Sequence, residues 1–205
     1  MRCAFLDSIR INLIDHFRQI LVDLNERLNR SDRTVAALDG VGFHYGFNSQ
    51  FIETIRDFWS NSYSWKKEEA YLNSFPQFKT NVAGLDIHFI HVQPANTTKR
   101  VLPLLLVHGW PGSFVEFLKI IPMLTEESEN EEFVFEIIAP SLPGYGFSQA
   151  TRKPGMGAIQ LALVFDKLMT RLGFNNYYVQ GGDWGSIIGT HMATLYPHRW
   201  YINTF

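Results

Sequence analysis

The chain has 205 residues, which is enough for one sizeable hydrophobic core or for a core with an appendage. Hydrophobic residues make up 46% and charged residues 19%, a balance that excludes an intrinsically disordered protein. The formal net charge of −2, without any cluster of Lys and Arg, argues against a nucleic-acid partner.

The first third of the chain, roughly residues 1–75, carries helical patterns. Apolar residues recur three or four positions apart, and charged residues interrupt the first such stretch, so it is neither a signal peptide nor a membrane span. Cys3 is the only cysteine, which rules out an internal disulfide and is compatible with a reducing compartment. The predicted helices are Leu6–Leu28, Phe51–Trp59 with Asn48 or Ser49 as its cap, and a third from Ser64 to a stop at Pro76.

After Pro76 the pattern changes to strands alternating with helices, which is typical of an α/β fold. Residues around Gly84 alternate between apolar and polar and predict a β-hairpin. The acidic run Thr125–Phe133 is interpreted as a solvated surface loop. Three almost wholly apolar runs predict buried parallel strands, with helices between and after them: strands Val101–Gly109, Phe133–Pro140 and Asn176–Gly182, and helices Phe114–Leu124, Ala158–Leu172 and Asp183–Tyr196.

The stretch "QGGDWGS" places Asp183 after an apolar strand and before a helix. Functional sites of α/β sheets lie outside such strand ends. Gly181 and Gly185 flank the acid and would relieve the crowding of a sharp strand-to-helix turn that exposes a nucleophile. The alternative is that Asp183 is only a helix N-cap, a common position for aspartate.

A second loop, "HGWPGS", follows the strand that ends near Val107. A loop at this place in a hydrolase sheet supplies one backbone N–H of an oxyanion hole, for which Trp110 is the candidate, and the residue after the nucleophile, Trp184, supplies the other. A turn at Pro111 with a cap at Ser113 is the structural alternative, and it is compatible with the functional one. A third loop, "PSLPGYGFS", follows the next strand.

The order and spacing of these three loops resemble those of the epoxide hydrolases of the α/β-hydrolase fold, and in particular the microsomal class that includes insect juvenile hormone epoxide hydrolases. The stretches "FWSNSYSWKKEEAYLNSFPQFKT" and "GLDIHFIHVQP" are similar to the N-terminal extension of that class. The resemblance implies Asp183 as nucleophile, Trp110 and Trp184 as backbone donors, and His108 as a structural histidine. It also implies an extension over residues 1–75 and, over 76–205, the N-terminal half of an α/β-hydrolase sheet.

The resemblance also implies parts that follow the nucleophile in such enzymes: two cap tyrosines, a histidine base and an orienting acid. Only 22 residues follow Asp183, and the chain looks C-terminally truncated. None of the seven histidines lies where the base is expected, and Tyr145 and Tyr196 suit packing positions better than the cap pair. We therefore expect the chain to be inactive alone. The alternatives are a non-catalytic decoy that captures a partner, or a protein like the haloalkane dehalogenases; Ser186 lies past the turn, which disfavours a serine esterase.

Further expectations concern ligands and location. The resemblance implies a small apolar epoxide and water as reactants, with no cofactor, no metal and no nucleic acid. By family it also implies the endoplasmic reticulum membrane, although no anchor is visible in this sequence, so a cytoplasmic location is the alternative.

Overall fold

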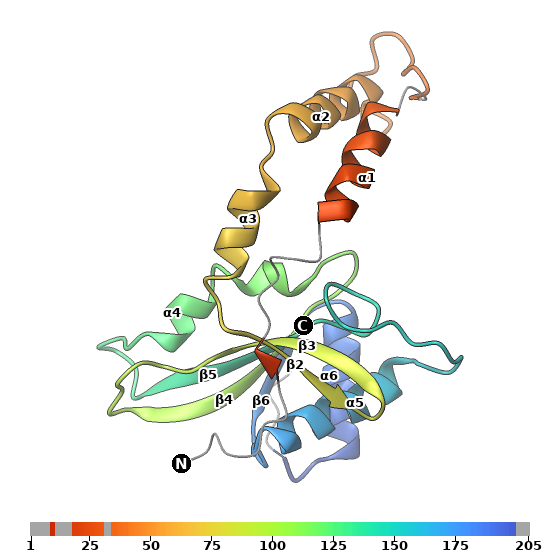
Figure 1. Cartoon of the computed structure of the whole chain (residues 1–205). Helices are drawn as coiled ribbons and strands as arrows, with labels where there is room; N and C mark the ends of the chain where they lie inside the picture. Colours follow the sequence, from red (N-terminus) through yellow and green to blue (C-terminus); the bar gives the residue numbers. More distant parts are fainter. Residues whose placement is uncertain (1–8, 11–17, 31–33, 200–205) are drawn as a thin grey trace. The chain divides into compact units, whose positions relative to one another are not determined.

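The computed structural model describes residues 9–10, 18–30 and 34–199. The chain divides into two compact units, one comprising residues 12–74 and the other residues 1–11 with 75–205 (Figure 1). Each unit is described by itself below. Within the described residues, no helix is both long and apolar enough to cross a lipid bilayer.

The first unit is helical, with α1 at Arg18–Asn29, α2 at Ser49–Asn61 and α3 at Trp65–Leu72. The predicted cap of α2 is confirmed, because the Asn48 side chain accepts a hydrogen bond from the Gln50 N–H at 2.9 Å. The third predicted helix is confirmed as α3. The predicted first helix is confirmed only from Arg18, and its residues 6–8 and 11–17 lie outside the described part of the chain.

The prediction of a helix at Ile9 was wrong. Ile9–Arg10 forms strand β1, which pairs antiparallel with Lys79 and Phe78 of β2. A helical apolar period could not reveal this, because backbone pairing with a distant strand overrides local propensity.

The second unit is built on a mixed sheet with the order β1-β2-β3-β5-β4-β6. The predicted hairpin is confirmed, with Ala83 and Gly84 in its turn at φ 53° and 85°. Strand β4 runs parallel to both β5 and β6, as expected for βαβ units. The strands are β2 at Gln77–Val82, β3 at Leu85–Val92, β4 at Arg100–Val107, β5 at Phe133–Pro140 and β6 at Tyr178–Gly181.

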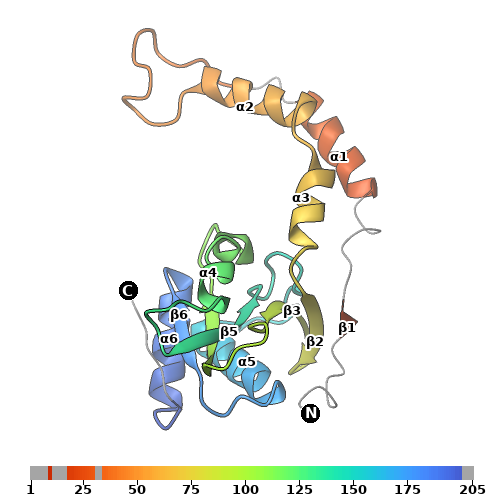
Figure 2. The same ribbon diagram turned by 90° about the vertical axis from the view of Figure 1, so that its left-hand side faces the viewer.

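Helices cover the two faces of this sheet unequally. Helices α5 (Ala158–Arg171) and α6 (Trp184–Leu195) lie on one face and α4 (Ile121–Thr125) lies over the other (Figures 1 and 2). Successive side chains of β4 point to opposite faces of the sheet. Leu105 and Val107 pack in the hydrophobic core with residues of α5 and α6. The α/β class predicted from the sequence is therefore confirmed.

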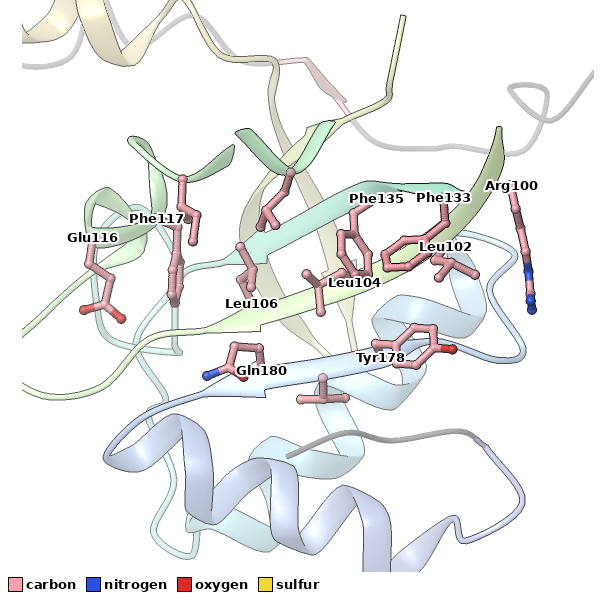
Figure 3. Close-up of a pocket in the computed structure, with 13 residues that line it drawn as sticks. Arg100, Leu102, Leu104, Leu106, Glu116, Phe117, Phe133, Phe135, Tyr178 and Gln180 are labelled. Atoms are coloured by element: carbon pink, nitrogen blue, oxygen red, sulfur yellow. The ribbon is translucent and has the colours of Figure 1, made fainter. Parts of the chain in front are cut away.

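A groove of about 880 Å³ lies over the second face, along strands β4, β5 and β6 and beside α4. Its lining is mostly apolar, and Figure 3 shows Glu116 and Gln180 at one end of it and Arg100 at the other. The apolar side chains that line it come from the three strands and from residues 117–124: Leu102, Leu104, Leu106, Phe133, Phe135, Tyr178, Val179, Phe117, Ile120 and Leu124.

The single helix predicted over Phe114–Leu124 is instead two short pieces. A 3₁₀ turn, η1, spans Phe114–Phe117, and α4 follows with Pro122 in its first turn. Proline lacks an N–H and is tolerated only at a helix start, so it begins a new helix here. The acidic run is confirmed as a connection, because α4 ends at Thr125 and β5 begins at Phe133.

Candidate active site

Asp183 occupies a sharp turn between β6 and α6. It is the N-cap residue of α6, and its backbone has φ 52° and ψ −123°. A positive φ is uncommon for a residue other than glycine and is a strained conformation that proteins keep mainly at functional sites. Its side chain makes no capping hydrogen bond to the helix. The capping alternative therefore loses its main support, and the carboxylate is available for another purpose.

Two glycines allow this turn to approach the end of β4. A Cβ on Gly181 would lie 2.7 Å from the carbonyl oxygen of Val107, and a Cβ on Gly185 would overlap the same oxygen. Both positions therefore require glycine because of space, and neither has a positive φ. The predicted supporting role of the two glycines in the turn thus has a geometric basis.

The parallel pairing of β4 with β6 places the 108–113 loop beside the turn. Val107 is paired with Gly181, so both strands end at the same edge of the sheet. The backbone N–H of Trp110 donates a hydrogen bond to Asp183 Oδ1 at 2.7 Å, although the two residues are 73 positions apart in the sequence. The N–H groups of Trp110 and then Trp184 stabilise the charged carboxylate and lower the pKa of Asp183. The carboxylate is therefore ionised at neutral pH.

His108 connects the loop to the next one along the edge. Its ring is fully buried, Nε2 accepts the Leu142 N–H at 3.0 Å, and Nδ1 lies 3.0 Å from the carbonyl oxygen of Gly109. Because Nε2 is an acceptor, the proton resides on Nδ1 and is donated to Gly109. Burial lowers the pKa of His108, so the ring stays neutral. These contacts suit a structural residue.

A cavity of about 450 Å³ opens over the β6–α6 turn. The 109–112 loop, Gly182 and Asp183 line it, and Glu116 completes the lining. Glu116 is not among the site residues predicted from the sequence, because no sequence pattern places it beside this loop. Pro111 lies in the loop after a cis peptide bond with Trp110.

The remaining candidates lie elsewhere. Tyr145 packs against the core with its ring 5.6 Å from that of His108, and Tyr196 is the C-cap residue of α6. Ser186 lies within α6, where its hydroxyl donates to the Asp183 carbonyl oxygen at 2.9 Å. Among the described residues, no histidine lines the cavity, and no group of three His, Cys, Asp or Glu side chains could hold a metal ion.

Comparisons with known proteins agree with this arrangement. Residues 10–117 match the family model "Epoxide hydrolase N terminus", and residues 103–199 match the model "alpha/beta hydrolase fold". The chain is 52% identical over 193 residues to "Juvenile hormone epoxide hydrolase 1" of Ctenocephalides felis, an alignment that covers 94% of this chain and 41% of that protein. It is 48% identical over 196 residues to "Epoxide hydrolase 1" of Oryctolagus cuniculus, with 93% and 43% covered.

A solved structure shows the same relation in three dimensions. The crystal structure of juvenile hormone epoxide hydrolase from the silkworm Bombyx mori matches with a TM-score of 0.90 and 43% identity, over 97% of this chain and 53% of that one. The chain thus spans 41% and 43% of the length of the two curated relatives described above. Because the N-terminal family model covers more than half of its residues, the chain belongs to the epoxide hydrolases, on an α/β-hydrolase fold.

Proposed function

We propose that Asp183 is the nucleophile of an epoxide hydrolase. Its carboxylate attacks one carbon of the strained ring, the bond from that carbon to the epoxide oxygen breaks, and an alkyl ester of Asp183 forms. The observation that carries the proposal is the 2.7 Å hydrogen bond from the Trp110 N–H to Oδ1, which orients an ionised carboxylate on a strained turn. The epoxide oxygen takes a proton from an acid or from water and becomes a hydroxyl group.

The second step is hydrolysis of this ester. Water attacks the carbonyl carbon of the Asp183 side chain, and the oxygen that becomes negatively charged is stabilised by the N–H groups of Trp110 and Trp184. Both amides act on the carboxylate in the free protein, which supports this assignment. Removal of one such donor costs about 2.7–4 kcal/mol of transition-state stabilisation in a serine protease. Breaking the tetrahedral intermediate releases a diol and restores the carboxylate.

The proposal extends to the parts of the chain and to its ligands. Residues 1–75 would be the N-terminal extension and residues 76–205 part of a hydrolase core, supported by His108, Pro111, Gly181 and Gly185. The substrate would be a small apolar epoxide, and the names of the insect relatives suggest a juvenile hormone as one candidate. Attachment to the endoplasmic reticulum membrane rests on the family resemblance alone.

The chain by itself should form the ester but not turn over. Among the described residues no histidine borders the cavity, so no histidine base stands ready to activate water for the second step. Incubation with styrene oxide followed by intact-mass spectrometry should show one added equivalent, and peptide mapping should locate it at Asp183. Asp183→Asn should remove the adduct. Sustained diol release would contradict the predicted stall, and an adduct that persists in Asp183→Asn would refute the nucleophile.

A further inference from the structure

The 109–112 loop contains two glycines, and each of them faces a different carboxylate. A Cβ on Gly109 would lie 2.6 Å from Asp183 Cβ and 2.8 Å from Oδ1. A Cβ on Gly112 would lie 2.5 Å from Glu116 Oε2. Neither glycine has a positive φ, so space is what matters at both positions. At Gly109 a side chain would meet Asp183 Cβ, whereas at Gly112 it would meet the end of the flexible Glu116 side chain and displace it. The loop is therefore in close contact with two acids, of which the proposed function uses one.

Glu116 reaches the loop because of where it lies in η1. The Glu116 N–H donates to the Ser113 carbonyl oxygen at 3.1 Å, which closes the turn directly after the loop. Side chains of helical turns lean toward the N-terminus, so this one extends back over Gly112. Partial burial, the largest cause, and the charge of Asp183 raise the pKa of Glu116, whereas a hydrogen bond from the Gly109 backbone lowers it.

The loop has few other anchors beyond His108. Trp110 is 64% exposed, so the packing of its side chain contributes little to holding the loop in place. Two glycines within four residues also raise the conformational entropy that must be lost to order it. His108 holds the beginning of the loop through its bonds to Gly109 and Leu142. Glu116 contacts both Gly109 and Gly112 and is the only charged side chain besides Asp183 among the described residues that line the cavity.

We propose that Glu116 is a positioning residue, whose carboxylate holds the 109–112 loop where the Trp110 N–H points at Asp183. This inference rests on the proposed function, because it assigns a partner to the donor of the oxyanion hole. Glu116 acts through the loop as a hydrogen-bond acceptor and does not touch the reacting atoms. Its variants should therefore alter the Trp110 donor but spare Trp184, which lies on α6.

Selective labelling of tryptophan with ¹⁵N tests this inference in the whole chain, which has only five such residues. The variants Trp110→Phe and Trp184→Phe each remove one labelled backbone signal from the spectrum, which assigns that signal. The backbone N–H itself is retained in both variants. In Glu116→Ala, the Trp110 amide proton should move upfield as its hydrogen bond weakens, while the Trp184 signal stays in place. Glu116→Gln retains an acceptor oxygen and should restore the Trp110 signal. Glu129→Ala, an acid in the surface connection before β5, serves as the matched control.

Adduct formation with styrene oxide gives a second readout. A displaced donor no longer orients the carboxylate, so Glu116→Ala should slow adduct formation by about 10- to 100-fold. Glu116→Gln and Glu129→Ala should react like the parent chain. An unmoved Trp110 signal in Glu116→Ala, or a Gln variant as impaired as the Ala variant, would overturn the inference. If the parent chain forms no adduct, the proposed chemistry fails while the amide signals still decide the role of Glu116.

Discussion

The buried imidazole of His88 joins three segments of the second unit through hydrogen bonds. Nδ1 lies 2.9 Å from the Ser141 hydroxyl, and Nε2 lies 3.0 Å from the side-chain oxygen of Gln77. Burial, helped by the nearby charge of Lys79, lowers the pKa of His88 to about 3. Between about pH 6.5 and 3 the ring therefore stays neutral in the folded chain, whereas the unfolded chain would protonate it.

This shift predicts acid sensitivity. The folded pKa lies below the unfolded value, so the unfolded state binds more protons between about pH 6.5 and 3, and stability falls as the pH drops through that window. One such group contributes a slope of about 1.4 kcal/mol per pH unit at most. Urea denaturation at pH 7, 6 and 5 should show this slope, and His88→Gln should reduce it. An equal slope in the variant would assign the effect to other groups, such as His108.

At the scale of single residues, chain order and residue type were enough to predict that Asp183 and the Trp110 amide lie together. Asp183 and Trp110 each follow an apolar strand, and parallel strands end at one edge of a sheet. Glu116 was missed because the role proposed for it depends on its position beside Gly112, which no periodicity encodes. The 2.5 Å spacing from a Cβ on that glycine becomes visible only with coordinates.

Among the secondary-structure elements, the β6–α6 turn restricts most strongly which residues its positions can hold. Gly185 lies in the first turn of α6, where an alanine would ordinarily favour the helix by about 1 kcal/mol. Here its methyl group would overlap the carbonyl oxygen of Val107 in β4. Gly182, three residues earlier, has open space around its Cβ position and no positive φ. The two glycines therefore form a natural pair for comparison.

Gly185→Ala should destabilise the chain by about 1–3 kcal/mol, because the crowded backbone must shift. Gly182→Ala should be neutral or stabilising by about 0.4–1 kcal/mol, since alanine restricts the unfolded chain without strain in the folded one. Thermal melts followed by circular dichroism would measure both. Equal melting temperatures for the two variants would mean that the close approach of α6 to β4 is wrong.

Elements with a strong pattern were predicted well, and those set by distant contacts were not. Strand Phe133–Pro140 was predicted with the observed limits, because its apolar run is bounded on both sides. The helix expected over 114–124 is divided in two, and Pro122 begins the second piece. This proline is visible in the sequence, but the prediction gave more weight to the helical spacing of the apolar residues. Strand β1 forms because it pairs with β2, and no local sequence pattern indicates that partner.

In the whole molecule, the second unit exposes features that favour association. Strand β6 ends the sheet order among the described strands, and the apolar groove lies over the same region. An open strand edge offers unpaired N–H and C=O groups to another chain, and lysine on such an edge discourages pairing. Tyr178 belongs both to β6 and to the groove lining. A charged side chain introduced at this position would therefore disfavour association through the strand edge and through the groove.

We expect the purified chain to self-associate as its concentration rises, and Tyr178→Lys to reduce that association. Ile159→Lys is the matched control, because it places the same charge at an exposed apolar position of α5. Sedimentation velocity over a concentration series distinguishes the cases, with circular dichroism to check that both variants are folded. A chain that stays monomeric and melts cooperatively would show that the open edge and groove are tolerated.

The register that pairs Val107 with Gly181 also has a consequence during synthesis. Trp110 is made 73 positions before Asp183, and β5 and α5 lie between them in the chain. The amide that orients the carboxylate can meet it only after β6 has emerged from the ribosome and docked beside β4. A nascent chain therefore carries the 109–112 loop through the synthesis of 73 further positions before Asp183 exists, and the anchored carboxylate appears only once the neighbouring sheet can receive it.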